Sequence, residues 1–247
     1  MKIIGIIPAR YDSKRFPGKV LADILGKPLI QKVYEQAKKA ELLNDILVAT
    51  DNEEIFKVVE NFRGKAIMTS SNCRSGTDRV AEVAKGLNAD IFVNIQGDEP
   101  LVSPEVISKV AQALIEDKTI DIATVAGKII TQEELNNPNV VKVVIDNDGF
   151  ALYFSRARIP YVRDSLELES LGSVCCKHIG LYAYRRDFLL NFVQMKQTPL
   201  EKIEDLEQMR ALENGYKIKV VITECDSVGV DTREDLEKVR KIFRNSE

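Results

Sequence analysis

The chain has 247 residues, 45% of them hydrophobic and 30% charged, so a folded α/β domain with some elaboration is expected and a disordered chain is excluded. Its 35 lysines and arginines against 38 aspartates and glutamates give a formal net charge of −3, which argues against a protein that binds nucleic acid or an anionic membrane over its whole surface. No apolar stretch approaches the roughly 20 residues of a membrane span, and the N-terminus lacks a signal-peptide pattern. The four scattered cysteines, at 73, 175, 176 and 225, are expected to be reduced, which favours a cytoplasmic protein.

The first hundred residues alternate between strand and helix patterns. Residues 3–7 are a continuous apolar run that ends at Pro8, which is typical of a strand buried on both faces of a parallel sheet. Further strands are predicted at 45–50, 65–69 and 90–95, and helices at 28–40, 52–62, 78–87 and after the Ser103-Pro104 pair, where serine would cap the helix. This βαβα series predicts a mostly parallel sheet with helices on both faces.

Beyond about residue 118 the pattern becomes richer in strands. Strands are predicted at 120–130, 140–145, 150–154, 178–184 and 217–223, the second and third forming a hairpin, with helices at 186–193, 201–213 and after a capping box at 232–235. Residues 160–177 are irregular and receive no assignment. The expected organisation is a single domain, 1–247, with a β-rich insertion at about 118–185.

The loop after the first strand is unusually basic. It contains Arg10, Lys14, Arg15 and Lys19 and a single acid, in a chain that is acidic overall. Ligands of open parallel sheets bind beyond the carboxyl ends of the strands, so these cations are well placed to neutralise phosphate oxygens. The loop matches neither the P-loop nor the glycine-rich dinucleotide pattern, and a solvated charged loop is the alternative interpretation.

Two aspartates follow apolar stretches and are candidate metal ligands. Asp98 comes directly after the strand at 90–95, with Gly97 permitting a tight turn, and Asp231 follows the last strand. Mg²⁺ favours one or two protein carboxylates together with phosphate and water oxygens. Alternatively, Asp98 belongs to an ordinary turn, and Asp231 interacts with the N-terminus of the last helix.

Seven blocks of the sequence together resemble the 3-deoxy-D-manno-octulosonate (Kdo) cytidylyltransferases. They lie at residues 3–20, 26–28, 75–79, 96–100, 151–156, 178–182 and 229–232. The resemblance implies a Rossmann-like, mostly parallel sheet flanked by helices, of the nucleotide-diphospho-sugar transferase type, with a β-rich dimerisation insertion. It also implies a cytoplasmic, Mg²⁺-dependent homodimer that converts CTP and Kdo into CMP-Kdo and pyrophosphate for lipopolysaccharide synthesis.

The resemblance further implies roles for particular residues. The nucleotide would be bound by Ala9, Arg10, Ser13, Arg15, Lys19, Ser75, Gly76 and Thr77. The sugar acid would be bound by Gln96, Arg156, His178, Tyr182 and Glu207. Asp98 and Asp231 would hold Mg²⁺, and Lys19, Arg10 and Asp98 would be the catalytic residues. His178 and Tyr182, four apart, would share one face of a strand, and Glu207 would lie on a helix.

Three other functions remain open from the residues alone. The protein could activate another acidic sugar such as sialic acid, or a sugar 1-phosphate, since the basic loop does not separate these substrates. A glycosyltransferase that consumes nucleotide sugars would be expected to carry an Asp-x-Asp pattern, whereas the block at 96–98 supplies only Asp98. A non-catalytic nucleotide-binding regulator would retain Lys19 and lose the metal-binding acids, but both aspartates are present.

Overall fold

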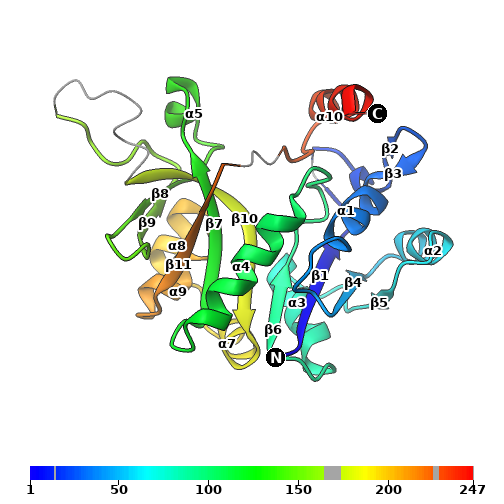
Figure 1. The fold of residues 1–247 in the computed structure, drawn as a ribbon, viewed down its shortest axis with the longest axis horizontal. Helices are drawn as coiled ribbons and strands as arrows, with labels where there is room; N and C mark the ends of the chain where they lie inside the picture. The colour runs from blue at the N-terminus through cyan, green and yellow to red at the C-terminus, as the bar shows by residue number, and fades with distance from the viewer. Residues whose placement is uncertain (14, 164–173, 225–227, 247) are drawn as a thin grey trace.

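The computed structural model describes residues 1–13, 15–163, 174–224 and 228–246, and a nine-stranded sheet runs through both halves of the chain (Figure 1). The strand order is β11-β7-β10-β6-β1-β4-β5, and the β8-β9 hairpin pairs with β10. The strands are β1 (Ile3–Ala9), β4 (Asp45–Thr50), β5 (Ala66–Met68), β6 (Ile91–Asn94), β7 (Ile122–Lys128), β8 (Lys142–Ile145), β9 (Ala151–Ser155), β10 (Cys175–Arg185) and β11 (Ile218–Thr223). A separate small sheet pairs β2 (Asp23–Ile24) with β3 (Lys27–Pro28).

The sheet is mostly parallel, as the βαβα pattern predicted. β1 pairs in parallel with β4 and β6, β4 with β5, and β7 with β11. β10 is the antiparallel strand between β6 and β7, and it also pairs antiparallel with β8. The antiparallel pairs of this sheet therefore involve β8 or β10, from the strand-rich second half of the chain, while β1, β4, β5 and β6 form a parallel unit.

Helices cover both faces of the sheet. They are α1 (Leu29–Ala37), α2 (Glu53–Asn61), α3 (Gly76–Lys85), α4 (Pro104–Glu116), α5 (Gln132–Asn136), α7 (Arg186–Phe192), α8 (Pro199–Glu204), α9 (Met209–Glu213) and α10 (Arg233–Ser246). One core packs α1, α2, α4 and α10 against the sheet, and the other packs α3, α7 and α9 against the opposite face. In β1, Ile3 and Ile7 belong to the first core and Ile4 and Ile6 to the second, so the prediction of burial on both faces is confirmed.

Most predicted elements are present, with small shifts of their ends. The strand at 45–50, the β8-β9 hairpin and the capping box are confirmed, the last by reciprocal bonds between Thr232 and the Asp235 side chain. Pro104 begins α4, but the Ser103 side chain makes no capping hydrogen bond. The single helix predicted at 201–213 is wrong: α8 ends where Asp205 adopts a left-handed φ of 52°, and α9 starts at Met209.

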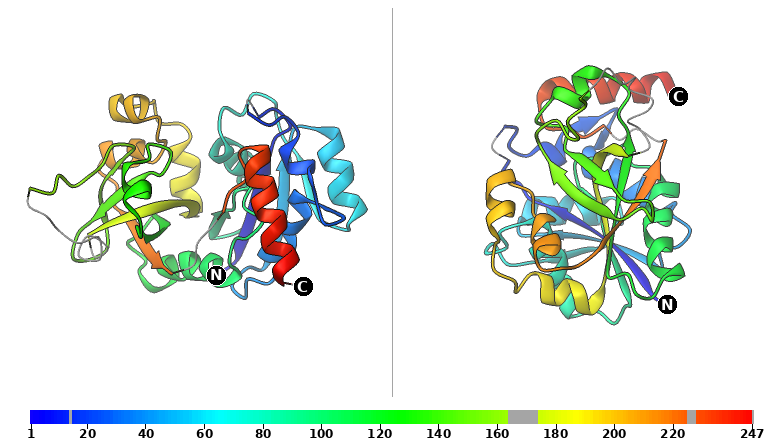
Figure 2. Two further views of the ribbon diagram at one scale, coloured as in Figure 1. Left: turned by 90° about the horizontal axis from the view of Figure 1, so that it is seen from above. Right: turned by 90° about the vertical axis from the view of Figure 1, so that its left-hand side faces the viewer.

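The C-terminal helix returns to the N-terminal half of the sheet. α10 lies beside β2 and α1 in Figure 1, and Arg240 donates two hydrogen bonds, of 2.9 and 2.6 Å, to the carbonyl of Asp23. Seen from above in Figure 2, the helix crosses the blue N-terminal strands, while the green and yellow strands of the second half lie on the other side. The segment before α10 is anchored by the Val230 amide, which donates to the Asp98 carbonyl at 2.9 Å. In the described part of the chain, no helix has the length and apolar character needed to span a membrane.

Candidate active site

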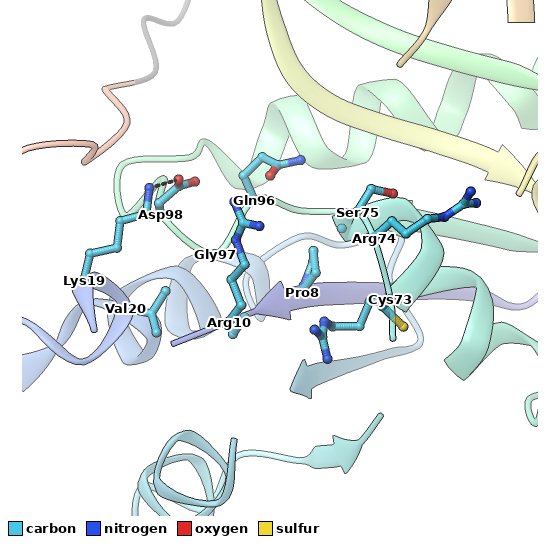
Figure 3. Close-up of a pocket in the computed structure, with 13 residues that line it drawn as sticks. Pro8, Arg10, Lys19, Val20, Cys73, Arg74, Ser75, Gln96, Gly97 and Asp98 are labelled. Atoms are coloured by element: carbon cyan, nitrogen blue, oxygen red, sulfur yellow. Dashed lines mark hydrogen bonds and ion pairs between the residues drawn. The ribbon is translucent and has the colours of Figure 1, made fainter. Parts of the chain in front are cut away.

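A cavity of about 340 Å³ opens at the carboxyl ends of β1 and β6 (Figure 3), the edge of the sheet where ligands are expected. Gly97 allows the loop after β6 to approach the end of β1, because a Cβ atom at this position would lie 2.8 Å from the carbonyl oxygen of Pro8. The cavity is lined by Pro8, Ala9, Arg10, Lys19, Val20, Cys73, Arg74, Ser75, Gly76, Arg79, Gln96, Gly97 and Asp98. Residues from three of the blocks that carry the resemblance, at 3–20, 75–79 and 96–100, therefore share one cavity.

Lys19 joins the two candidate metal ligands at one end of this cavity. Its Nζ atom lies 2.5 Å from Asp98 Oδ2 and 2.9 Å from Asp231 Oδ1, and Arg15 Nη2 contacts the other oxygen of Asp231 at 2.7 Å. Figure 3 shows Lys19 facing Asp98, with Arg74 and Ser75 at the opposite end. Burial opposes the charge of Lys19, but Asp98 and Asp231 together outweigh it and raise the pKa of the lysine above its usual value.

The two carboxylates form a donor set that suits Mg²⁺. Both reach the same ammonium group, so their oxygens converge although residues 98 and 231 are far apart in sequence. Among the described residues, no group of three or more histidine, cysteine or acidic side chains is arranged to hold a metal ion. Mg²⁺ does not require such a cage, because it commonly keeps water and substrate phosphate oxygens beside one or two carboxylates.

The basic loop folds back on itself before Lys19. Gly18 adopts a left-handed φ of 68°, and its amide donates to the Tyr11 carbonyl at 2.8 Å, which turns the chain into the short 3₁₀ helix η1 (Lys19–Leu21). Arg10 is exposed and lines the cavity, as does the backbone of the buried Ala9. Ser13 lies in the same loop, half-buried, whereas Lys14 lies outside the described residues. The loop thus presents Arg10 and Lys19 to one cavity.

The turn at 75–77, which is predicted to bind the nucleotide, is hydrogen-bonded to Glu207, a residue expected to bind the sugar. Ser75 caps α3 by accepting a hydrogen bond from the Asp78 amide at 3.1 Å, and its hydroxyl donates to Glu207 Oε1 at 3.0 Å. Thr77 donates to Glu207 Oε2 at 2.6 Å. Burial raises the pKa of Glu207 although both hydroxyls favour its charged form. Glu207 lies between α8 and α9, so the expectation that it lies on a helix is wrong.

Gln96, His178 and Tyr182 are brought together around a β-bulge in β10. Gln96 lines the cavity and donates from Nε2 to the Gly180 carbonyl at 2.9 Å. The His178 and Tyr182 rings share one face, and their centroids lie 5.3 Å apart, closer than an offset of four would bring them in a regular strand. Burial lowers the pKa of His178 to about 3 and raises the pKa of Tyr182 well above its ordinary value, so both rings are neutral at pH 7.

Arg156 has a different environment from the other predicted sugar ligands. Its guanidinium donates to the carbonyls of Glu204 at 2.8 Å, Pro138 at 3.2 Å and Asp205 at 3.2 Å. These bonds stabilise the end of α8 and the hairpin region. Its role in sugar binding stays a prediction, and the structure gives it a structural function.

Arg79, Arg74 and Cys73 line the cavity but were not predicted from the sequence as site residues. Arg79 is 4% exposed, donates to Asp51 Oδ2 at 2.8 Å and also bonds Thr69, while Arg74 pairs with Asp78 at 3.0 Å. Burial and then a hydrogen bond to Glu82 raise the pKa of the Cys73 thiol to about 11, so it is a poor nucleophile. Arg79 belongs to the block at 75–79, so a basic residue beside the turn at 75–77 was the sequence signal that could have identified it.

A basic loop, a convergent pair of carboxylates and a mostly parallel sheet together define a nucleotidyltransferase. The sequence model of the cytidylyltransferase family matches residues 4–218. A glucose-1-phosphate thymidylyltransferase from Bacillus anthracis, described as putative, shares the fold with a TM-score of 0.69 at 14% identity, over 98% of this chain and 96% of that one.

Relatives of higher identity define the family more narrowly. 3-Deoxy-manno-octulosonate cytidylyltransferases from Geotalea uraniireducens and Syntrophus aciditrophicus are 54% and 52% identical, covering 97% and 98% of this chain and 98% and 97% of theirs. A solved structure of CMP:2-keto-3-deoxy-manno-octonic acid synthetase complexed with CTP superposes with a TM-score of 0.93 at 41% identity, and each chain is covered completely. The chain belongs to the 3-deoxy-manno-octulosonate cytidylyltransferase family.

Proposed function

We propose that this protein transfers the cytidylyl group of CTP to the anomeric hydroxyl of Kdo, giving CMP-Kdo and pyrophosphate in a Mg²⁺-dependent reaction. The observation that carries the proposal is the convergence of Lys19, Asp98 and Asp231 beside a cavity that also contains Arg10 and Gln96. A triphosphate needs cations, and a metal ion that it shares needs carboxylates. Similarity over the full chain to Kdo cytidylyltransferases supports the choice of nucleotide and sugar.

The chemistry requires positioning and charge neutralisation more than a protein nucleophile. The hydroxyl oxygen of Kdo forms the new bond to the α-phosphorus, the bond to the β-phosphate oxygen breaks, and the hydroxyl proton passes to water. Asp98 and Asp231 would hold Mg²⁺, which when bound would polarise the α-phosphate and neutralise charge on the leaving group. Lys19 and Arg10 would stabilise the negative charge of the triphosphate.

The remaining predicted residues would bind the two substrates. Ala9, Ser13, Arg15 and the turn at 75–77 would contact the nucleotide, since they belong to the loop and turn that border the cavity. Gln96, His178 and Tyr182 would contact the sugar acid, and their clustering around one bulge supports this role. Glu207 would act together with Ser75 and Thr77, which it already bonds.

The test is pyrophosphate release from CTP and Mg²⁺, with Kdo, sialic acid and a sugar 1-phosphate compared in parallel. Release with Kdo alone that EDTA abolishes is the expected result. Release only with another acceptor would overturn the sugar assignment, and release that persists in EDTA would overturn the metal assignment.

We also propose that the protein is a cytoplasmic homodimer that associates through the insertion at about 118–185. Large apolar side chains are exposed in this region, including Ile130, Leu152, Tyr161 and Val174. Such a concentration is typical of an interaction surface. Light scattering coupled to size-exclusion chromatography should give twice the chain mass, and Tyr161→Glu with Leu152→Glu should shift the mass toward that of one chain. A wild-type mass of one chain would contradict the proposal.

A further inference from the structure

A buried threonine lies inside the bulge of β10. From Ile179 to Tyr182 the chain advances three residues along β10, while its partners on β7 advance by one, from Val125 to Thr124. Gly180 and Leu181 are therefore extra residues, and Thr124, fully buried, faces them from β7. A bulge of this kind redirects neighbouring side chains and is frequent beside functional sites.

The hydroxyl of Thr124 has four polar neighbours, one of which is the Tyr182 hydroxyl. Its Oγ1 atom lies 2.9 Å from the carbonyl oxygen of Leu181, 3.4 Å from that of Ile179 and 2.9 Å from Nε2 of His178. A hydroxyl has one hydrogen to donate and lone pairs to accept, whereas a carbonyl oxygen only accepts. The threonine hydrogen therefore points to Leu181, and the hydroxyl oxygen accepts a hydrogen from Nε2 of His178.

This assignment determines the chemical form of the histidine. A neutral imidazole carries one proton, so a proton on Nε2 leaves Nδ1 as a hydrogen-bond acceptor. The ring is held in place by Phe154 and Tyr182, whose centroids lie 5.2 and 5.3 Å away. Within the described part of the chain no hydrogen bond reaches Nδ1. His178 keeps part of its surface exposed, although protein atoms surround the ring closely enough to disfavour its charged form. Nδ1 is thus an acceptor that no described residue uses.

We propose that Thr124 is a positioning residue that holds His178 as the Nε2–H tautomer, so that Nδ1 accepts a hydrogen bond from a hydroxyl group of the sugar acid. The inference rests on the proposed function for its substrate, but not for the tautomer. The site then favours a polyhydroxylated ligand at this point, because an unprotonated ring nitrogen has no hydrogen to donate to the oxygens of a carboxylate or a phosphate.

The tautomer can be measured without any substrate. His178 is the only histidine in the chain, so protein labelled with ¹⁵N-histidine contains a single imidazole. Long-range ¹H–¹⁵N correlation spectra should show a protonated Nε2 and a bare Nδ1, unchanged from about pH 5 to about pH 9, because burial keeps the ring neutral. A proton on Nδ1, or an imidazolium that titrates in this range, would overturn the proposal.

Two substitutions test the consequence for substrate binding. Thr124→Val removes the hydroxyl at nearly constant shape, and we expect mixed tautomers and a rise of about tenfold in the KM for Kdo, with kcat and the KM for CTP nearly unchanged. Thr124→Ser keeps the hydroxyl and should restore both the tautomer and the KM. Thr50→Val is the matched control, since Thr50 is equally buried on β4 but its hydroxyl accepts a hydrogen bond from the Asn52 amide and none from His178.

The positioning role of Thr124, the tautomer of His178 and the identity of the substrate are tested by different outcomes. Equal KM values for Kdo in Thr124→Val and wild-type protein would overturn the positioning role, and so would a failure of Thr124→Ser to restore the tautomer. If Thr124→Val does not fold, the wild-type and Thr124→Ser spectra still decide the tautomer. Failure of the proposed function would appear separately, as wild-type protein that releases no pyrophosphate with Kdo, and that result would overturn the substrate part of the inference.

Discussion

Replacing Lys19 by methionine tests the centre of the proposed site most directly. The substitution keeps the aliphatic stem, which is largely buried, and removes only the ammonium group that contacts Asp98 and Asp231. Two carboxylates are then left facing the same point without their shared cation. Both the stability of the fold and the reaction rate should respond, but by different amounts.

The structure allows the change in the free energy of unfolding and the change in kcat/KM to be estimated. The Lys19 side chain is 12% exposed, whereas Asp98 and Asp231 are 28% and 49% exposed, so solvent screens both ion pairs, and Asp231 keeps Arg15. We therefore expect the free energy of unfolding to fall by about 1–2 kcal/mol. A preorganised group that stabilises transition-state charge contributes about 10²–10³-fold, so kcat/KM should fall by that factor, or about 3–4 kcal/mol.

Urea unfolding followed by circular dichroism and steady-state pyrophosphate release measure the two quantities. Lys27→Met is the matched control: Lys27 also pairs with a carboxylate, Glu35, at 2.8 Å, but its side chain is 43% exposed and does not line the cavity. It should change the free energy of unfolding by no more than about 0.5 kcal/mol and leave kcat/KM unchanged. A kcat/KM of Lys19→Met within twofold of wild type would refute the reasoning.

Three further results are expected. Asp98→Ala should abolish turnover while the circular dichroism spectrum stays native, and a wild-type rate would remove Asp98 from the metal site. Arg156→Met should lower the free energy of unfolding by about 2 kcal/mol through the three lost carbonyl bonds, with little change in the KM for Kdo; a large rise in that KM at unchanged stability would instead make Arg156 a sugar ligand. The Glu201–Arg210 pair is buried, and although burial opposes the charge of Glu201, Arg210 lowers the pKa of this carboxyl below its ordinary value of 4.5; its contribution is therefore present above about pH 4.5 and lost as the pH falls through the lowered pKa. Urea titrations at a series of acidic pH values should show this loss in wild-type protein and a shallower pH dependence in Glu201→Gln, whereas identical slopes would contradict the assignment.

The sequence by itself determined the elements whose signal is local. A strand buried on both faces has a continuous apolar run, which is why 3–7 and 45–50 were predicted close to β1 and β4. Side-chain spacing likewise predicted α1 and α2, and the reciprocal chemistry of Thr232 and Asp235 predicted the start of α10. The basic loop and Asp98 were found because charge directly after a buried strand is informative without knowledge of distant contacts.

Tertiary structure alone decided which residues meet. Lys19 contacts Asp231, 212 residues away, because α10 returns to the N-terminal half, and no local periodicity specifies that path. Glu207 was expected on a helix because its neighbourhood has helical spacing, yet a left-handed Asp205 ends α8 and the carboxylate binds Ser75 and Thr77 across about 130 residues.

The bulge in β10 is also a tertiary feature. An even offset predicted a shared face for His178 and Tyr182, but only the two residues inserted opposite β7 bring the ring centroids to 5.3 Å. The same bulge places the Thr124 hydroxyl within hydrogen-bond distance of both the Leu181 carbonyl and Nε2 of His178. Pairing register depends on the partner strand as well as on the strand itself. The types of residue in this site could therefore be predicted from sequence, whereas their contacts, protonation and mutual support follow from how the strands are paired.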